Sequence, residues 1–326
     1  MRPEFSVIFL TTLIGAGQGL FLALVATQIG AVFDLLPAQD GRSFYATGSL
    51  VALAATGLGL VASFFHLGRP ERGWRAIARW RTSWLSREVI VLPAFMAAVF
   101  AYGLAHWTGW RPALATLPGG GVVDATLVIG IAASLLAFAL FVCTAMIYAC
   151  LPFLREWHSP LTVLNFVLLG SASGFTLAAA FAGVAAPSLA RLFGTWALVL
   201  LGLAFVSRGG SLLRNARLRP RSTIQTAIGI KHPRIVQISP GFESGSFNTR
   251  EFFHGRTRAA LRSVKWGFLV AVFVIPALLL AAALWTALPG WLPAAFAVQY
   301  AGLLAERWYF FAEANHPQNL YYQAIG

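Results

Sequence analysis

The sequence predicts an all-α integral membrane protein, a bundle of eight transmembrane helices that forms a single domain over residues 1–326. Hydrophobic residues make up 58% of the chain and charged residues only 11%, which is more apolar surface than a soluble core can bury. Many of the 11 tryptophans lie beside the ends of the apolar runs, as in the aromatic belts of bilayer interfaces. No segment has the ten-residue alternation of a membrane β-barrel, so the spans are expected to be helices.

Eight apolar segments are long enough to cross about 30 Å of hydrocarbon at about 1.5 Å per residue. They are expected at 5–32, 44–66, 85–107, 122–150, 160–185, 188–206, 264–286 and 290–311. The first lacks a following small-residue cleavage pattern, so we expect it to be retained as a helix. Its glycines at 15, 17 and 19 favour close packing against another helix, and Gln18 between them either supports that packing or faces a polar cavity.

The distribution of basic residues predicts the orientation of the bundle. Of the 24 Lys and Arg residues, 21 fall on the side of the N-terminus, leaving Arg42, Arg111 and Arg191 on the other. The positive-inside rule then places both termini in the cytoplasm. Because the basic residues lie in connecting segments, the net charge of +13 favours lipid headgroups and an acidic protein partner over nucleic acid.

Two connections stand out on the expected cytoplasmic side. Residues 67–84 have arginines and apolar residues at helical spacing, which predicts an amphipathic basic segment lying on the membrane surface. Residues 207–262 form a long basic insertion with no core of its own. Such a segment is typical of a surface on which a partner protein docks.

The stretch HLGRPERGWRAIARWRTSWLSRE, from His66 to Glu88, contains six arginines and three tryptophans between two apolar segments. His66 closes the second expected span and Glu88 opens the third, so the two side chains are expected near the same membrane face. A carboxylate inside an apolar helix is costly to bury and is therefore a functional candidate. The structural alternative is that Glu88 pairs with Arg87 or another loop arginine and that His66 is an interfacial cap.

Several classes of chemistry are disfavoured by the motifs that are missing. The sequence has no P-loop, dinucleotide fingerprint, serine triad or HExxH motif, and its two cysteines lack CxxC spacing. His66 and His106 are expected at opposite membrane faces, so we expect neither haem nor metal in this chain. A proton-coupled transporter is a competing class, although the two halves show no matched pair of broken helices.

What remains is an acid, an imidazole and several arginines beside an apolar slot, which suits quinone chemistry because two protons must move with two electrons. In this hypothesis the headgroup of a ubiquinone or menaquinone lies between His66 and Glu88. Arg69, Arg81 and Arg87 stabilise its anionic forms or anchor the loop to lipid headgroups.

The block FHLGRPERGWRAIARWRTSWLSRE and the eight-helix layout resemble the membrane anchor subunit of DMSO-reductase-type molybdenum enzymes, essentially from end to end. The resemblance implies a haem-free anchor that exchanges electrons between the quinone pool and a four-cluster ferredoxin-like iron–sulfur subunit, which serves a molybdopterin catalytic subunit. It also places the quinone-site histidine and glutamate of the family on His66 and Glu88. Trp84 and Gln18 complete the set of candidate quinone-contacting residues.

The segments FSVIFLTTLIGAGQGLFLAL, FNTREFFHG and AERWYFFAEANHPQNLYYQ are most similar to the branch of this family found in cytoplasmic membrane-bound sulfite dehydrogenase complexes. That similarity implies sulfite oxidation with quinone reduction. The alternative within the family is a quinol-oxidising anchor of a DMSO or other oxyanion reductase.

Overall fold

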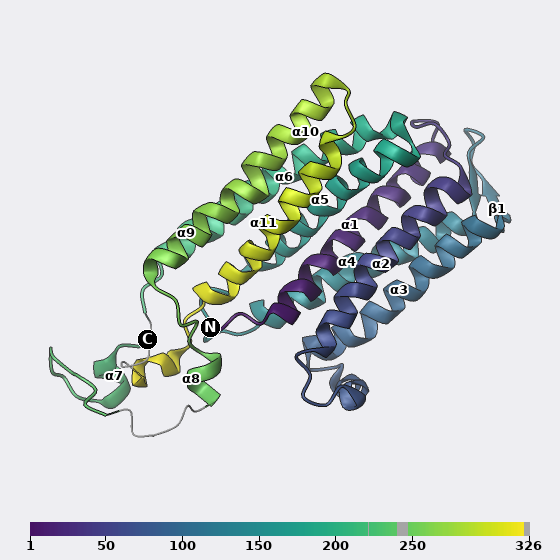
Figure 1. Ribbon diagram of the computed structural model, residues 1–326. Helices are drawn as coiled ribbons and strands as arrows, with labels where there is room; N and C mark the ends of the chain where they lie inside the picture. Colours follow the sequence, from purple (N-terminus) through teal and green to yellow (C-terminus); the bar gives the residue numbers. More distant parts are fainter. Residues whose placement is uncertain (221, 240–246, 323–326) are drawn as a thin grey trace.

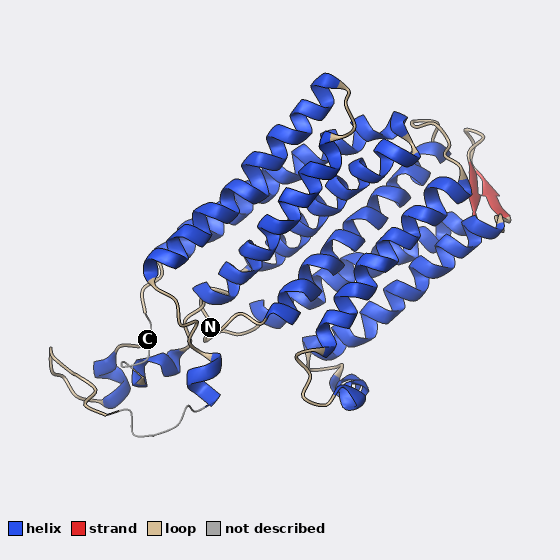
Figure 2. Cartoon of the chain, in the orientation of Figure 1, coloured by secondary structure: helices blue, strands red, loops and turns tan. Residues whose placement is uncertain are grey.

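The computed structural model describes residues 1–220, 222–239 and 247–322, and helices dominate it (Figures 1 and 2). The long helices of the bundle match the expected segments in order. They are α1 Phe5–Val32, α2 Thr47–Phe64, α3 Trp84–Thr108, α4 Ala125–Ala149, α5 Pro160–Ala185, α6 Pro187–Ala216 and α11 Trp291–Glu313, together with a composite helix before α11. This composite consists of α9 Arg258–Leu269, the π-helical turn η3 Val270–Val274 and α10 Ile275–Thr286.

Seven helices in the described part of the chain are long and apolar enough to cross a membrane. The eighth expected span corresponds to α11, which lies in the bundle beside α5, α9 and α10 (Figure 1). It is not among the seven, and its sequence contains Gln299, Glu306 and Arg307, all of them buried. The polar residues that lower its mean hydropathy therefore point into the protein.

Several boundaries differ from the expected ones, and two of them, the start of α4 and the end of α6, have an evident physical reason. A short antiparallel hairpin, β1 Ala113–Thr116 with β2 Val122–Asp124, precedes α4, so the chain is not wholly α-helical. The fourth span was expected from residue 122, but α4 starts at Ala125 because the Asp124 carboxylate accepts the backbone N–H of Leu127 at 2.9 Å and caps the helix.

The sixth span was expected to end at residue 206, but α6 continues to Ala216. Its added turns contain Arg208, whose side chain is only 2% exposed and forms an ion pair with α11. In a sequence, an arginine that follows an apolar run suggests the end of the membrane span. Here the tertiary ion pair allows the helix to continue with that arginine inside the protein.

Helix α1 packs against α2, α4, α5 and α11, and its contact with α5 confirms the packing predicted from the glycines. A Cβ atom at Gly19 would lie 2.7 Å from the carbonyl oxygen of Gly170 and 2.8 Å from the Cα of Gly174. Both distances are too short for a side chain. The two backbones therefore approach as closely as they do only because these positions are glycine.

One end of the bundle collects the N-terminus, the described residues that follow α11 and most of the irregular segments (Figure 1). The loop between α2 and α3 contains the 3-10 helix η2 Pro70–Arg79, which has no buried residue, as expected of a surface segment. The insertion 207–262 contributes the end of α6, the short helices α7 Ile224–Ile228 and α8 Phe247–Glu251, and the start of α9. Its residues 221 and 240–246 lie outside the described part.

Candidate functional site

The centre of the candidate site is Glu88, the fifth residue of α3. Ser83 caps this helix by accepting the backbone N–H of Ser86, which sets the helical phase that turns Glu88 inward. The side chain is 7% exposed, and its carboxyl group accepts a hydrogen bond from the hydroxyl of Thr144 on α4 at 2.5 Å. A carboxyl group in this position is shielded from bulk water and from lipid.

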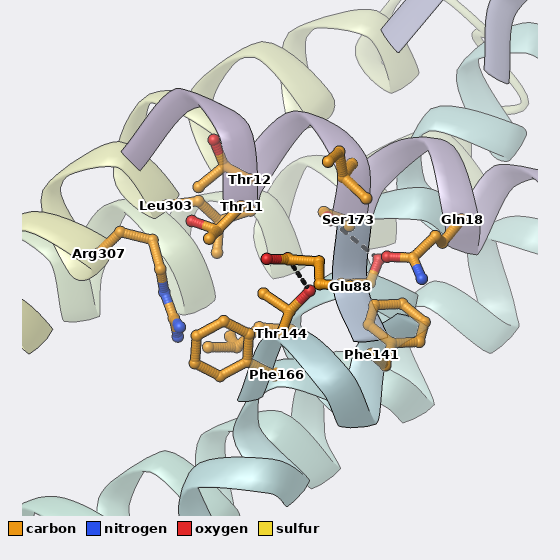
Figure 3. Close-up of a pocket in the computed structure, with 14 residues that line it drawn as sticks. Thr11, Thr12, Gln18, Glu88, Phe141, Thr144, Phe166, Ser173, Leu303 and Arg307 are labelled. Atoms are coloured by element: carbon orange, nitrogen blue, oxygen red, sulfur yellow. Dashed lines mark hydrogen bonds between the residues drawn. The ribbon is translucent and has the colours of Figure 1, made fainter. Parts of the chain in front are cut away.

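Glu88 lines a partly enclosed cavity between α1, α3, α4, α5 and α11 (Figure 3). The volume of the cavity is about 30 Å³, which suits one or two water molecules rather than a quinone ring. Its walls include aromatic rings and an unusual number of polar groups. Apart from Arg307, the polar residues are Thr11, Thr12, Gln18, Glu88, Thr144 and Ser173.

Gln18 is the second predicted site residue on this cavity. Its side chain is 2% exposed, and its amide nitrogen donates to the carbonyl oxygen of Ala137 on α4 at 2.7 Å. Gln18 was expected either to support helix packing or to face a polar cavity. It does both, because it joins α1 to α4 and lines the cavity.

His66 lies two residues beyond the end of α2, and its side chain is exposed rather than part of the cavity wall. Partial desolvation lowers the pKa of the imidazole, and the carboxylate of Glu4 opposes that shift. His66 and Glu88 thus flank the same α2–α3 connection, but the structure does not bring their side chains into one cavity.

The loop arginines and Trp84 also lie outside the cavity. Arg87 donates from Nε to the carbonyl oxygen of Trp80 and from Nη2 to that of Arg81, both at 2.9 Å, and its guanidinium lies 4.2 Å from the centroid of the Trp84 ring. Arg87 therefore holds the loop and forms no ion pair with Glu88, contrary to the structural alternative. Arg81 stacks on Trp80, and Arg69 is exposed.

Sequence reasoning missed a buried ionic cluster between α6 and α11. Glu306 is fully buried and lies between two arginines: its Oε1 is 2.7 Å from Nε of Arg208, and its Oε2 is 2.6 Å from Nε of Arg307. Glu313 adds a longer contact to Arg208 at 3.8 Å. Charged residues within an apolar helix are the signal that could have revealed the cluster.

A metal site is not apparent in the described residues, where no group of three or more His, Cys, Asp or Glu side chains is placed to hold an ion.

Comparison with known proteins agrees with this architecture. Residues 1–310 match the family described as DMSO reductase anchor subunit (DmsC). The chain is also similar to a protein from Allochromatium vinosum that is named as one of the subunits of sulfite dehydrogenase, with 57% identity over 325 residues that cover 100% of both chains. The family match spans nearly the whole bundle, including the cavity and, from the ionic cluster, Arg208, Glu306 and Arg307. The protein therefore belongs to the DMSO reductase anchor subunit family.

Proposed function

We propose that this chain is the membrane anchor and quinone-reactive subunit of a sulfite dehydrogenase complex. In this proposal it spans the bacterial inner membrane eight times, with α11 as the eighth span and both termini in the cytoplasm. A four-cluster iron–sulfur subunit docks on the cytoplasmic end and receives electrons from a molybdopterin subunit that oxidises sulfite. The full-length similarity to a sulfite dehydrogenase subunit of Allochromatium vinosum supports this substrate, and the basic insertion at that end supports the docking site.

The observation that carries the quinone role is the burial of Glu88 in a polar cavity near the α2–α3 end of the bundle. Burying a titratable group away from bulk water is costly for stability, and such groups cluster at functional sites. The cavity suits water, so the quinone ring is proposed to lie outside it, on the lipid-facing side where His66 is exposed.

The electrons and protons of the proposed reaction balance. The iron–sulfur partner supplies two electrons, one at a time, and the quinone takes up two protons to become a quinol. Glu88 gives one proton through the cavity water and regains a proton from the cytoplasm, and the second proton comes from the cytoplasm by way of His66. If a complex of this family instead reduces an oxyanion, the same residues accept the protons released by quinol.

The test is the variant Glu88→Gln in the purified complex. Glutamine keeps the size of the side chain but holds no transferable proton, so sulfite-dependent quinone reduction is expected to fall on the order of 100-fold. The exposed Glu71→Gln serves as the matched control and should retain parent turnover. Parent turnover in an assembled Glu88→Gln complex would remove the proton-transfer role.

A further inference from the structure

The cavity beside Glu88 has a cationic wall that the sequence did not suggest. Arg307 reaches into it from α11, and Figure 3 shows the guanidinium and the Glu88 carboxyl group approaching the same space from different sides. The Nη1 atom of Arg307 is buried and has no hydrogen-bond partner among the described residues. A buried donor without an acceptor is costly, which points to an oxygen-bearing occupant of this cavity.

The direction of the Arg307 side chain is set by Glu306 and by two aromatic rings, those of Phe166 and Phe310. Its Nε lies 2.6 Å from Oε2 of Glu306, and the opposite oxygen of Glu306 is held by Arg208 at 2.7 Å. The guanidinium also lies 4.2 Å from the centroid of the Phe166 ring and 5.0 Å from that of Phe310. Because Nε is paired with Glu306 and the guanidinium lies over two aromatic rings, the side chain has little freedom to rotate. Its Nη1 atom is therefore held at the cavity.

The charges around Glu88 show why the buried Nη1 donor of Arg307 matters for a negatively charged Glu88. Glu306 and Glu313 balance Arg208 and Arg307 within the ionic cluster, and no ion pair in the described chain includes Glu88. If Glu88 loses its proton, the new carboxylate has one direct hydrogen-bond donor, Thr144. That is too little to hold a buried negative charge.

Two titratable groups near Glu88, Cys143 and Tyr148, lie on α4. Neither supplies a positive charge.

We infer that Arg307 is a positioning residue that stabilises the carboxylate of Glu88 through water in the cavity after Glu88 has given its proton toward quinone. The inference rests on the proposed function. Arg307 keeps its own proton throughout, because a guanidinium does not deprotonate in proteins. The proton that Glu88 loses goes to a quinone oxygen, and its replacement comes from the cytoplasmic solvent.

The test compares Arg307→Gln with Arg191→Gln, a control on α6 whose side chain is exposed and outside this cavity. In the purified complex, Arg307→Gln should lower sulfite-dependent quinone turnover about tenfold, a typical loss for one group that assists proton transfer, and Arg191→Gln should leave it unchanged. In redox-induced infrared difference spectra, the carboxyl signal of Glu88 is identified by its loss in Glu88→Gln. This signal should change in Arg307→Gln and stay the same in Arg191→Gln.

A double-mutant cycle separates this role from a structural one. Because the two residues act as a unit, Glu88→Gln with Arg307→Gln should be no slower than Glu88→Gln alone. Additive losses, or an unchanged infrared signal, would overturn the inference. If the Arg307→Gln complex does not assemble, Arg307→Lys is used in the same cycle with the same criterion.

The two proposals fail in distinguishable ways. Parent turnover in Glu88→Gln removes the proposed proton-transfer role of Glu88, and the role of Arg307 with it. Slow turnover in Glu88→Gln together with parent turnover in Arg307→Gln overturns only the role of Arg307.

Discussion

The arginines of this protein occupy two contrasting environments. Those of the α2–α3 connection lie on the surface, where Arg81 and Arg87 stack on tryptophan rings and Arg72 is 3.8 Å from the carboxylate of Glu71. Arg208 and Arg307 lie inside the bundle and share one fully buried carboxylate, that of Glu306. The first group is conspicuous in the sequence, and Arg307 of the second group reaches the cavity that Glu88 lines.

The difference shows that the number of arginines in a segment is a poor guide to where a cation is needed. A guanidinium at the surface is solvated and screened, so its contacts add little stability and it remains free to meet lipid headgroups or a partner. A buried guanidinium requires an anion in contact, and the helices must be positioned to supply one. Helix α11 supplies that anion, Glu306, to Arg208 on α6 and to its own Arg307.

The largest effect is expected from Glu306→Gln. This change leaves two buried arginines without their shared carboxylate, and removing one partner of a buried pair typically costs about 3–5 kcal/mol. The matched change at the surface, Glu71→Gln, should cost less than about 0.5 kcal/mol because both partners are more than half exposed. Thermal unfolding of the purified complex measures both, and equal shifts in Tm would contradict the comparison.

A smaller effect is expected from Arg87→Ala. This arginine is the surface residue with the most contacts to its own loop, through the carbonyl oxygens of Trp80 and Arg81 and the ring of Trp84. Losing them should destabilise the α2–α3 connection by about 1 kcal/mol. Hydrogen exchange should report faster opening of residues 80–84, whereas the control Arg69→Ala should leave exchange there unchanged. Identical exchange in the two variants would show that Arg87 does not hold the loop.

The smallest effect concerns His66 and pH. Because desolvation lowers the pKa of its imidazole in the folded protein, the folded state binds this proton less readily than the unfolded state. Stability should therefore fall slightly as the pH drops below the ordinary histidine value of about 6.5 toward the lowered value. His66→Gln should remove that part of the acid-induced decrease in Tm. An unchanged decrease would show that His66 is as solvated as the loop arginines.

Sequence reasoning anticipated most of the helical layout and part of the site. Uninterrupted apolar length predicted the seven membrane-candidate helices, and the fifth matched its expected bounds of 160–185. Glu88 and Gln18 were singled out because polar side chains inside apolar helices are costly, and both line the cavity. The same criterion, applied to the last helix, would have included Glu306 and Arg307.

The sequence by itself determined that this chain is a bundle of apolar helices with its basic residues concentrated at one end, since both properties depend on composition and spacing along the chain. Tertiary structure alone decided which polar groups meet. His66 and Glu88, close in sequence, face different surroundings, whereas Glu88 and Arg307, far apart in sequence, share one cavity. The reason is that burial and ion pairing depend on how helices are rotated and packed against one another, which no single segment encodes.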